Sequence, residues 1–463
     1  FPLLLQRTAV GGGWWPSLGV QNHRKPLEGV GAAAGGRLGM PMPAAISLPG
    51  IPASLLEALE AEARRQGLGV LALVGGAVRD ALLHHEHRDP WRGLPDLDLV
   101  VEGSSERLAH GLQQQLGPER VSELRVHGRF GTVEMVVDGV LLDLAQARQE
   151  RYPAPGENPV VEPGPLLEDL ARRDFSVNAM ALLLTPDSGP AAGALPLSTL
   201  LDPHGGRQHL AQRQLMFLHP SSVADDPTRV IRAARYAARL GFNLAPQALD
   251  QLQRTLQAWP WRWRLGDDPA SAPPALATRL RMELELLLER EAWAVALAQL
   301  QAWGALVLLD PLLQQQPRAL QRRLRWAARL QLPLLTALVA GAGAPLELAS
   351  RLQLPHQQQR WLEELAALQA WLTEQVLPAA WQAWSPARWC EALEARPWPP
   401  EVVALAVCLQ GPCWRPLLRW WGRWRHVTPP CSARELMATG LRPGPQLGEA
   451  LRRLRLQRLE AMR

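Results

Sequence analysis

The sequence contains very little lysine, few tyrosines and few cysteines. Of its 49 lysine and arginine residues only Lys25 is a lysine, and two tyrosines stand against 19 tryptophans. No run of about 18 consecutive apolar residues occurs, which excludes a membrane-spanning helix. The four cysteines lack paired Cys-X-X-Cys spacing, which argues against a disulfide framework and against a zinc ribbon. We therefore expect reduced thiols and a cytoplasmic protein.

The chain does contain enough apolar material for several packed cores. It has 463 residues, 47% of them hydrophobic and 20% charged, and a net charge of +5, which is typical of a globular protein of about three domains. Its positive charge is carried by arginine, whose planar guanidinium binds phosphate in a bidentate way. The last 49 residues hold 11 arginines and 3 glutamates. Such a segment is either a solvated face or a nucleic-acid contact.

The composition and the pattern of predicted elements change along the chain. Residues 1–48 are rich in glycine, proline and alanine, and we interpret them as a disordered leader or as translated sequence upstream of the true start. Residues up to about 200 mix strand and helix patterns. After about residue 225 the strand patterns fade, and nearly all of residues 226–463, which end in the basic segment, should be helical. The predicted fold class is α+β, with a mixed-sheet head followed by an all-α region.

Periodicity and turn residues place the elements of the first half. We expect a helix over Leu55–Gln66, a buried strand over Gly69–Val74 and a second strand over Asp98–Val101. A hairpin is expected from Phe130–Val137 and Val140–Leu144, because Asp138-Gly139 is a strong two-residue turn. After about residue 225 the pattern favours helices, with most tryptophans acting as core anchors.

Two short motifs in the head indicate phosphate and metal chemistry. Gly75 and Gly76 follow the buried strand and precede a helix with Arg79 on its first turn, so backbone N–H groups can approach a phosphate there. Asp96 and Asp98 point to the same side of a strand. Like charges so close favour a divalent cation, and Mg²⁺ is usual where phosphates complete the shell. Taken alone, each motif is also compatible with a tight turn or a solvated strand edge.

A third carboxylate is expected beside this pair. Asp143 is the preferred candidate, because it lies at the end of the second hairpin strand. Glu134, on the first hairpin strand, is the alternative, since alternation of side chains does not choose between them without the register.

Two later motifs combine arginine with aspartate. Arg172-Arg173-Asp174 precedes an apolar stretch and offers a fork to a triphosphate and an acceptor to a sugar hydroxyl. Asp226 precedes Pro227, which predicts a helix start, and Arg229 lies on the same first turn. A carboxylate that accepts from an exocyclic amine, beside a guanidinium that donates to a ring nitrogen, selects cytosine and adenine.

The segments GGAVRD (75–80), DLDLVVEG (96–103), RRDFSVNAMA (172–181) and DDPTRVIRAARYAARLGF (225–242) resemble, in this order, the bacterial class II tRNA nucleotidyltransferase/poly(A) polymerase family. The resemblance covers roughly residues 73–287. Further similarities lie at Leu201–Gly206, at Arg279–Leu284 and at Gly440–Gly448. The His-rich segment 84–91 departs from the family pattern, and we interpret it as an exposed insertion.

The resemblance implies a polymerase β-like nucleotidyltransferase head (49–200), a helical neck with the template motif (201–300), and a helical body with an RNA-binding tail (301–463). It also implies the roles of individual residues. Two Mg²⁺ ions would be held by Asp96 and Asp98 with a third acid, and the nucleotide would be bound by Gly75, Gly76, Arg79, Arg173, Asp174, Asn178, Asp226, Arg229 and Arg232. RNA contacts in the tail would be made by Arg442, Arg452, Arg453 and Arg455.

The function that the resemblance implies is transfer of nucleotides from CTP and ATP to the 3′ end of tRNA, adding CCA or part of it and releasing pyrophosphate. A-only addition, CC-only addition and poly(A) synthesis stay open. Two other classes are a non-catalytic RNA-binding helical protein and a nucleotidyltransferase that acts on small molecules; the intact aspartate motifs argue against the first and the basic tail against the second. No membrane and no obligate protein partner are expected.

Overall fold

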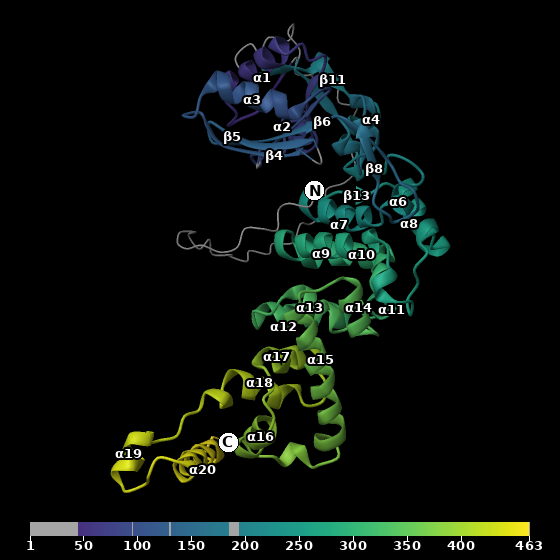
Figure 1. Cartoon of the computed structure of the whole chain (residues 1–463). Helices are drawn as coiled ribbons and strands as arrows, with labels where there is room; N and C mark the ends of the chain where they lie inside the picture. The colour runs from purple at the N-terminus through teal and green to yellow at the C-terminus, as the bar shows by residue number, and fades with distance from the viewer. Residues whose placement is uncertain (1–44, 95, 129–130, 185–193, 463) are drawn as a thin grey trace, which may run out of the picture. The chain divides into compact units, whose positions relative to one another are not determined.

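The computed structural model (Figure 1) describes residues 45–94, 96–128, 131–184 and 194–462. Most of the predicted leader, residues 1–44, therefore lies outside the described residues. Its last part is folded, because β1 (Ala45–Ser47) pairs with β10 (Ala194–Pro196) and Ile46 is fully buried. The predicted leader boundary at residue 48 is wrong for these residues. Within the described part, no helix combines the length and the apolar character needed to cross a bilayer.

The head is built on a mixed seven-stranded sheet. In spatial order its strands are β11 (Leu200–Leu201), β9 (Ala181–Leu183), β2 (Leu71–Val74), β3 (Leu97–Val101), β6 (Val140–Gln146), β5 (Thr132–Val137) and β4 (Val121–His127). Strands β3 and β6 run parallel, and the other neighbours are antiparallel. The predicted hairpin is confirmed as β5–β6; Phe130 lies outside the described residues. Asp138 and Gly139 both have positive φ (51° and 79°), as a two-residue hairpin turn requires.

Alternating side chains give the sheet two covered faces. Leu73 and Leu99 point into the main core beneath α1 (Ala53–Arg65), α2 (Gly76–His87) and α3 (Ser105–Leu116), which lie together over this face (Figure 1). Val74 and Val100 point the other way, into a smaller core that includes α4 (Leu166–Ala171). Asp98 shares this second face with Val100, because side chains two apart on a strand point to the same side.

The region that follows is almost entirely helical, as predicted. Its helices are α5 (Gly206–Ala211), α6 (Ser222–Asp225), α7 (Thr228–Leu240), α8 (Pro246–Ala258), α9 (Thr278–Arg290), α10 (Trp293–Ala302), α11 (Pro311–Gln315), α12 (Pro317–Arg329), α13 (Leu334–Val339), α14 (Pro345–Arg351), α15 (His356–Trp371), α16 (Pro386–Glu394), α17 (Pro400–Leu409), α18 (Trp414–Gly422), α19 (Ala433–Ala438) and α20 (Pro445–Glu460). Short strands β12 (Gln214–Leu215) and β13 (Asn243–Leu244) pair in parallel, so one strand lies beyond residue 225.

Segment 84–91 is not the exposed insertion that we expected. It completes α2, and His85 Nε2 lies 2.8 Å from the Ser47 carbonyl oxygen on β1. Glu86, within α2, pairs with Arg207 on α5 at 2.8 Å, and Asp89, beyond the helix, pairs with Arg213 at 2.5 Å. The segment is half-buried and ties the first half of the head to the helices that follow.

Candidate active site

Three carboxylates meet on the second face of the head sheet. Asp98 on β3 lies opposite Asp143 on β6 in the parallel register of these strands, and Asp96 precedes Asp98 by two residues. One carboxylate oxygen from each of Asp96, Asp98 and Asp143 lies within 4.8 Å of the other two. The sheet register therefore brings the predicted aspartate pair together with the preferred third acid.

Glu134, the alternative third acid, lies one strand farther away. Glu134, on β5, lies opposite Asp143 on β6, so β6 separates Glu134 from Asp98. Its carboxylate lies 3.8 Å from His127 Nε2, and its side chain is 38% exposed. Strand order thus answers a question that side-chain alternation left open.

The carboxylate cluster carries more negative charge than its surroundings compensate. Burial, and then the charge of Asp96, raises the pKa of Asp98 to about 6, against the smaller lowering effect of Arg173 and Arg79. Burial and the charges of Asp98, Asp96 and Glu134 raise the pKa of Asp143 to about 7. Mutual repulsion of this kind is relieved when a cation binds. Because all donors are carboxylate oxygens, which hard divalent ions prefer, the residues fit a Mg²⁺ site that a nucleotide's phosphates complete.

The glycine corner lies directly beside this cluster. Gly75 has φ +70°, a conformation that favours glycine, and it precedes the first residue of α2. A Cβ atom at this position would lie 3.0 Å from Asp98 Oδ2 and 3.3 Å from Arg173 Nη1. The absence of a side chain at Gly75 therefore keeps open a narrow space between a carboxylate and a guanidinium.

A continuous polar network runs from the glycine corner to the predicted template motif. Arg79 Nη1 donates to Asn178 Oδ1 at 2.8 Å, and Asn178 Nδ2 donates to Asp174 Oδ1 at 3.1 Å. Asp174 Oδ2 lies 3.3 Å from Arg232 Nε, and Arg232 Nη2 donates to Asp226 Oδ2 at 3.1 Å. Five predicted nucleotide-binding residues from separate motifs are thus linked across the head and the helix α7.

Asp226 is a buried carboxylate with a full set of donors. Oδ1 accepts from the Thr228 N–H at 3.1 Å and from the Thr228 hydroxyl at 2.5 Å, and Oδ2 accepts from Arg232 at 3.1 Å and Arg279 at 2.5 Å. The arginine charges outweigh burial, which acts the other way, and lower the pKa of Asp226 to about 2. The predicted helix start is wrong by one residue: the N-cap of α7 is Pro227 and the helix begins at Thr228, whose N–H donates to Asp226 Oδ1.

Arg229 lies one turn from Asp226 and is 2% exposed. Its Nη2 donates to the Arg172 carbonyl at 2.9 Å, and its Nη1 lies 3.2 Å from His219 Nε2. Among the described residues, the buried Nε–H of Arg229 has no hydrogen-bond partner. A buried donor without a partner is costly; the Nε–H groups of Arg173 and Arg232 are in the same state.

Two residues that hold the site in place had no predicted role. Asp169 on α4 is fully buried and accepts from Arg172 Nη2 at 2.7 Å and from Arg173 Nη2 at 3.0 Å. Its spacing of three and four residues before these arginines is the helical ion-pair signal that could have identified it. Arg279 was noticed only within a motif, because nothing in the local sequence indicates that α9 brings it to Asp226.

The tail arginines divide into two kinds. Arg442, Arg452 and Arg453 are exposed. Arg455 instead turns inward, pairs with Glu394 at 2.5 Å and donates to the Val427 carbonyl at 2.7 Å. The guanidinium of Arg455 therefore holds α20 against α16 in this structure, whereas the other three are open to solvent.

Comparison with known proteins shows which families the chain is similar to. Residues 71–216 match the family model of the poly A polymerase head domain. A CC-adding tRNA nucleotidyltransferase of Deinococcus radiodurans is 40% identical over 247 residues, which is 53% of this chain and 57% of that protein. An A-adding tRNA nucleotidyltransferase of Aquifex aeolicus is 41% identical over 175 residues, 37% of this chain and 19% of that protein. The chain thus spans about half the length of the first relative, and less of the second.

The solved structure of the Thermotoga maritima CCA-adding enzyme complexed with tRNA has the same fold, with a TM-score of 0.60 at 21% identity over 88% of this chain and 91% of that chain. The shared fold is a mixed sheet followed by a helical region, and in this chain the sheet carries an aspartate pair beside a glycine corner. Residues 71–216 match the head-domain model of the poly A polymerase family, and over about half of its length the chain is similar to a tRNA nucleotidyltransferase.

Proposed function

We propose that the chain is a template-independent RNA nucleotidyltransferase that adds CCA, or part of it, to the 3′ end of tRNA from CTP and ATP. The observation that carries this proposal is the polar network that links Arg79, at the glycine corner beside the carboxylate cluster, to Asp226 of the template motif. In the proposed organisation residues 49–200 are the head, 201–300 the neck, and 301–463 the body and tail. A cytoplasmic location fits this activity and stays a prediction.

The reaction forms a bond between the RNA 3′-hydroxyl oxygen and the α-phosphorus, and it breaks the bond from that phosphorus to the pyrophosphate. Asp96, Asp98 and Asp143 would hold two Mg²⁺ ions. When bound, Mg²⁺ lowers the pKa of the attacking hydroxyl and neutralises the leaving oxygens. Gly75 leaves room for the triphosphate, and Arg173, fixed by Asp169, presents a charge toward it. Positioning of the reactants supplies much of the remaining acceleration.

Base selection would rest on Arg229 and Asp226. The unpartnered Nε–H of Arg229 can donate to the ring nitrogen that cytosine and adenine present beside their exocyclic amine. All acceptor positions of Asp226 are filled, so an incoming amine has to displace a donor. Arg279 is the donor best placed to leave, since it is 27% exposed, whereas Arg232 is also held by Asp174 and Glu283. In this proposal Arg279 covers the template carboxylate until a nucleotide replaces it.

The relatives leave the specificity of addition open, because one is a CC-adding and the other an A-adding enzyme. The test uses three purified tRNAs that end before CC, after CC and after CCA, with Mg²⁺ and labelled CTP or ATP. Incorporation of C and then A shows a complete CCA-adding enzyme. C alone or A alone shows a partial enzyme, and a long A ladder shows a poly(A) polymerase. No incorporation into any acceptor would overturn the proposal and favour a non-catalytic RNA-binding protein.

A further inference from the structure

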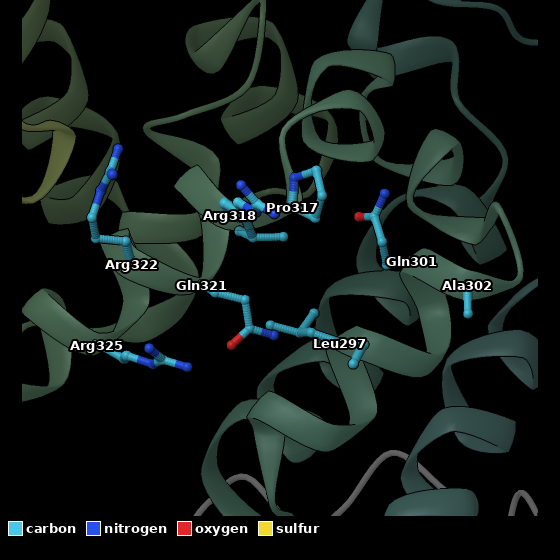
Figure 2. A pocket seen from close by; sticks show the side chains of 10 residues that line it. Leu297, Gln301, Ala302, Pro317, Arg318, Gln321, Arg322 and Arg325 are labelled. Carbon is cyan, nitrogen blue, oxygen red and sulfur yellow. The ribbon is translucent and has the colours of Figure 1, made fainter.

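A cleft of about 600 Å³ lies between α10 and α12, far along the sequence from the carboxylate cluster. Figure 2 shows Leu297, Gln301 and Ala302 of α10 on one side and the arginine side chains of α12 on the other. The walls are mostly apolar, and the charged groups that line it are Arg318, Arg322 and Arg325. Low-dielectric walls of this kind strengthen the field of the charges beside them.

These arginines form one exposed row on α12. Arg318, Arg322 and Arg325 recur at helical spacing and are exposed, and Arg329 continues the row by one further turn. The sequence of α12 contains no acidic residue, and that of α10 contains no charged residue. In the described part of the chain no carboxylate lies within ion-pair distance of these three guanidinium groups, whereas Arg323, on the opposite side of α12, is buried.

The row continues onto a neighbouring helix through two tryptophans in edge-to-face contact. Arg329 lies over Trp326, whose ring is 5.6 Å from that of Trp414 at the start of α18, and Arg415 lies over Trp414 at 5.2 Å. The tryptophan rings hold these guanidinium groups at the surface and leave their N–H groups free of carboxylates. Unpaired cations in a row repel one another, so the binding of a polyanion to this surface is electrostatically favourable.

We propose that the α12 arginine row (Arg318, Arg322, Arg325 and Arg329) binds the phosphate backbone of the RNA substrate, as a contact separate from the basic tail. The proposal rests on the proposed function, which requires the enzyme to hold a tRNA while its 3′ end occupies the head. Guanidinium groups match phosphate geometry in a bidentate way, and contacts to the backbone position an RNA without reading its sequence.

The test compares two triple variants of equal charge. Arg318→Ala/Arg322→Ala/Arg325→Ala removes the row beside the cleft, and Arg64→Ala/Arg107→Ala/Arg125→Ala removes three exposed arginines of the head. Thermal unfolding first establishes that both variants are folded. The tRNA dissociation constant is then measured over a range of salt concentrations.

The cleft variant should bind tRNA more weakly, and its slope of log K against log salt should be shallower by about 2 to 3, since each lost phosphate contact removes about 0.7 to 0.9. The head variant should keep the wild-type slope. Equal slopes for the cleft variant and the wild type, with wild-type incorporation intact, would overturn this inference and leave the proposed function standing. Absence of wild-type incorporation would instead overturn the proposed function.

A second, independent observation concerns how Arg229 is oriented. A guanidinium N–H can only donate, so the 3.2 Å contact between Arg229 Nη1 and His219 Nε2 requires Nε2 to be the acceptor. The proton of a neutral His219 is then on Nδ1, which lies 3.0 Å from the Ser221 hydroxyl. That hydroxyl donates to Asp225 Oδ2 at 2.7 Å. Each group thus donates to the next, from Arg229 through His219 and Ser221 to Asp225.

We infer that neutral His219 is a positioning residue for base selection, acting through Arg229. The groups that face its ring are Arg229, Asp225, Ser221 and His204, and Gln251 binds its backbone carbonyl. Burial and the Arg229 charge lower the pKa of His219, so the ring is neutral at neutral pH. Protonation at acid pH would remove the acceptor and place a cation against Arg229.

The readout is the ratio of kcat/KM for the preferred nucleotide to that for UTP, followed from pH 8 to pH 5. The wild-type ratio should fall as the pH decreases. At pH 8 the ratio for His219→Phe should be lower than that of the wild type by about tenfold or more, since the variant loses a hydrogen bond to a charged group, and this difference should narrow towards pH 5. His219→Gln keeps an acceptor without a titrating ring and should give a flat profile. His356→Gln, at an exposed histidine on α15, is the control and should keep the wild-type profile. A wild-type ratio in His219→Phe would overturn the inference.

Discussion

Replacing Asp98 by asparagine should make the metal-free protein more stable while abolishing nucleotide incorporation. Repulsion and burial raise the pKa of Asp98 from 3.8 to about 6, so the native state binds more protons than the unfolded state between these values. Stability therefore decreases as the pH rises through this window. The shift of about two units corresponds to about 3 kcal/mol at most, and screening by solvent at the partly exposed site reduces this to about 1–3 kcal/mol.

Chemical denaturation at pH 8 and at pH 4, without divalent cations, measures this effect. Asp98→Asn should exceed the wild type in unfolding free energy at pH 8, and the difference should shrink towards pH 4, where the native carboxyl is protonated. Adding Mg²⁺ at pH 8 should stabilise the wild type more than the variant.

Asp138→Asn is the matched control on the same sheet. Its ion pair with Arg120, at 2.6 Å, lowers the pKa of Asp138, so its contribution is present above the ordinary aspartate pKa and lost as the pH falls. This variant should be less stable than the wild type at pH 8. The reasoning is refuted if Asp98→Asn is destabilised at pH 8, or if its difference from the wild type is the same at both pH values.

Three further outcomes are expected. Gly75→Ala should lower incorporation at least about tenfold, because its Cβ would lie 3.0 Å from Asp98 Oδ2 of the aspartate cluster. Gly139→Ala is the control, since Gly139 has a similar positive φ and nothing lies within 4 Å of its added Cβ. Equal activity losses in the two variants would contradict the crowding argument. Arg279→Met should raise the pH midpoint of acid unfolding, since the buried template carboxylate loses a donor; an unchanged midpoint counts against this pairing. Arg452→Ala/Arg453→Ala should weaken tRNA binding and make its salt dependence shallower by about 2, and an unchanged slope would remove these residues from the RNA interface.

The sequence was sufficient to predict the parts of the site that depend on local patterns. The aspartate pair is read from strand alternation, the glycine corner from the turn between a strand and a helix, and the β5–β6 hairpin from Asp138-Gly139. Each of these depends on residues that are neighbours in the chain, so the physical rule applies without knowledge of the tertiary fold.

What the sequence could not supply depends on long-range packing. Asp143 rather than Glu134 joins the cluster because β6, not β5, lies next to β3, and strand order is a property of the whole sheet. Arg279 reaches Asp226 only through the packing of α9 against α7. Similarly, Arg455 pairs with Glu394, 61 residues away, so its charge alone gave no sign that it points inward.

The most direct test of the central claim measures incorporation and tRNA binding in the same preparation of Asp96→Ala. If the carboxylate cluster performs the chemistry, the variant binds tRNA with the wild-type dissociation constant and adds no labelled C or A to any of the three acceptors. Incorporation at the wild-type rate by a folded Asp96→Ala protein would contradict the account.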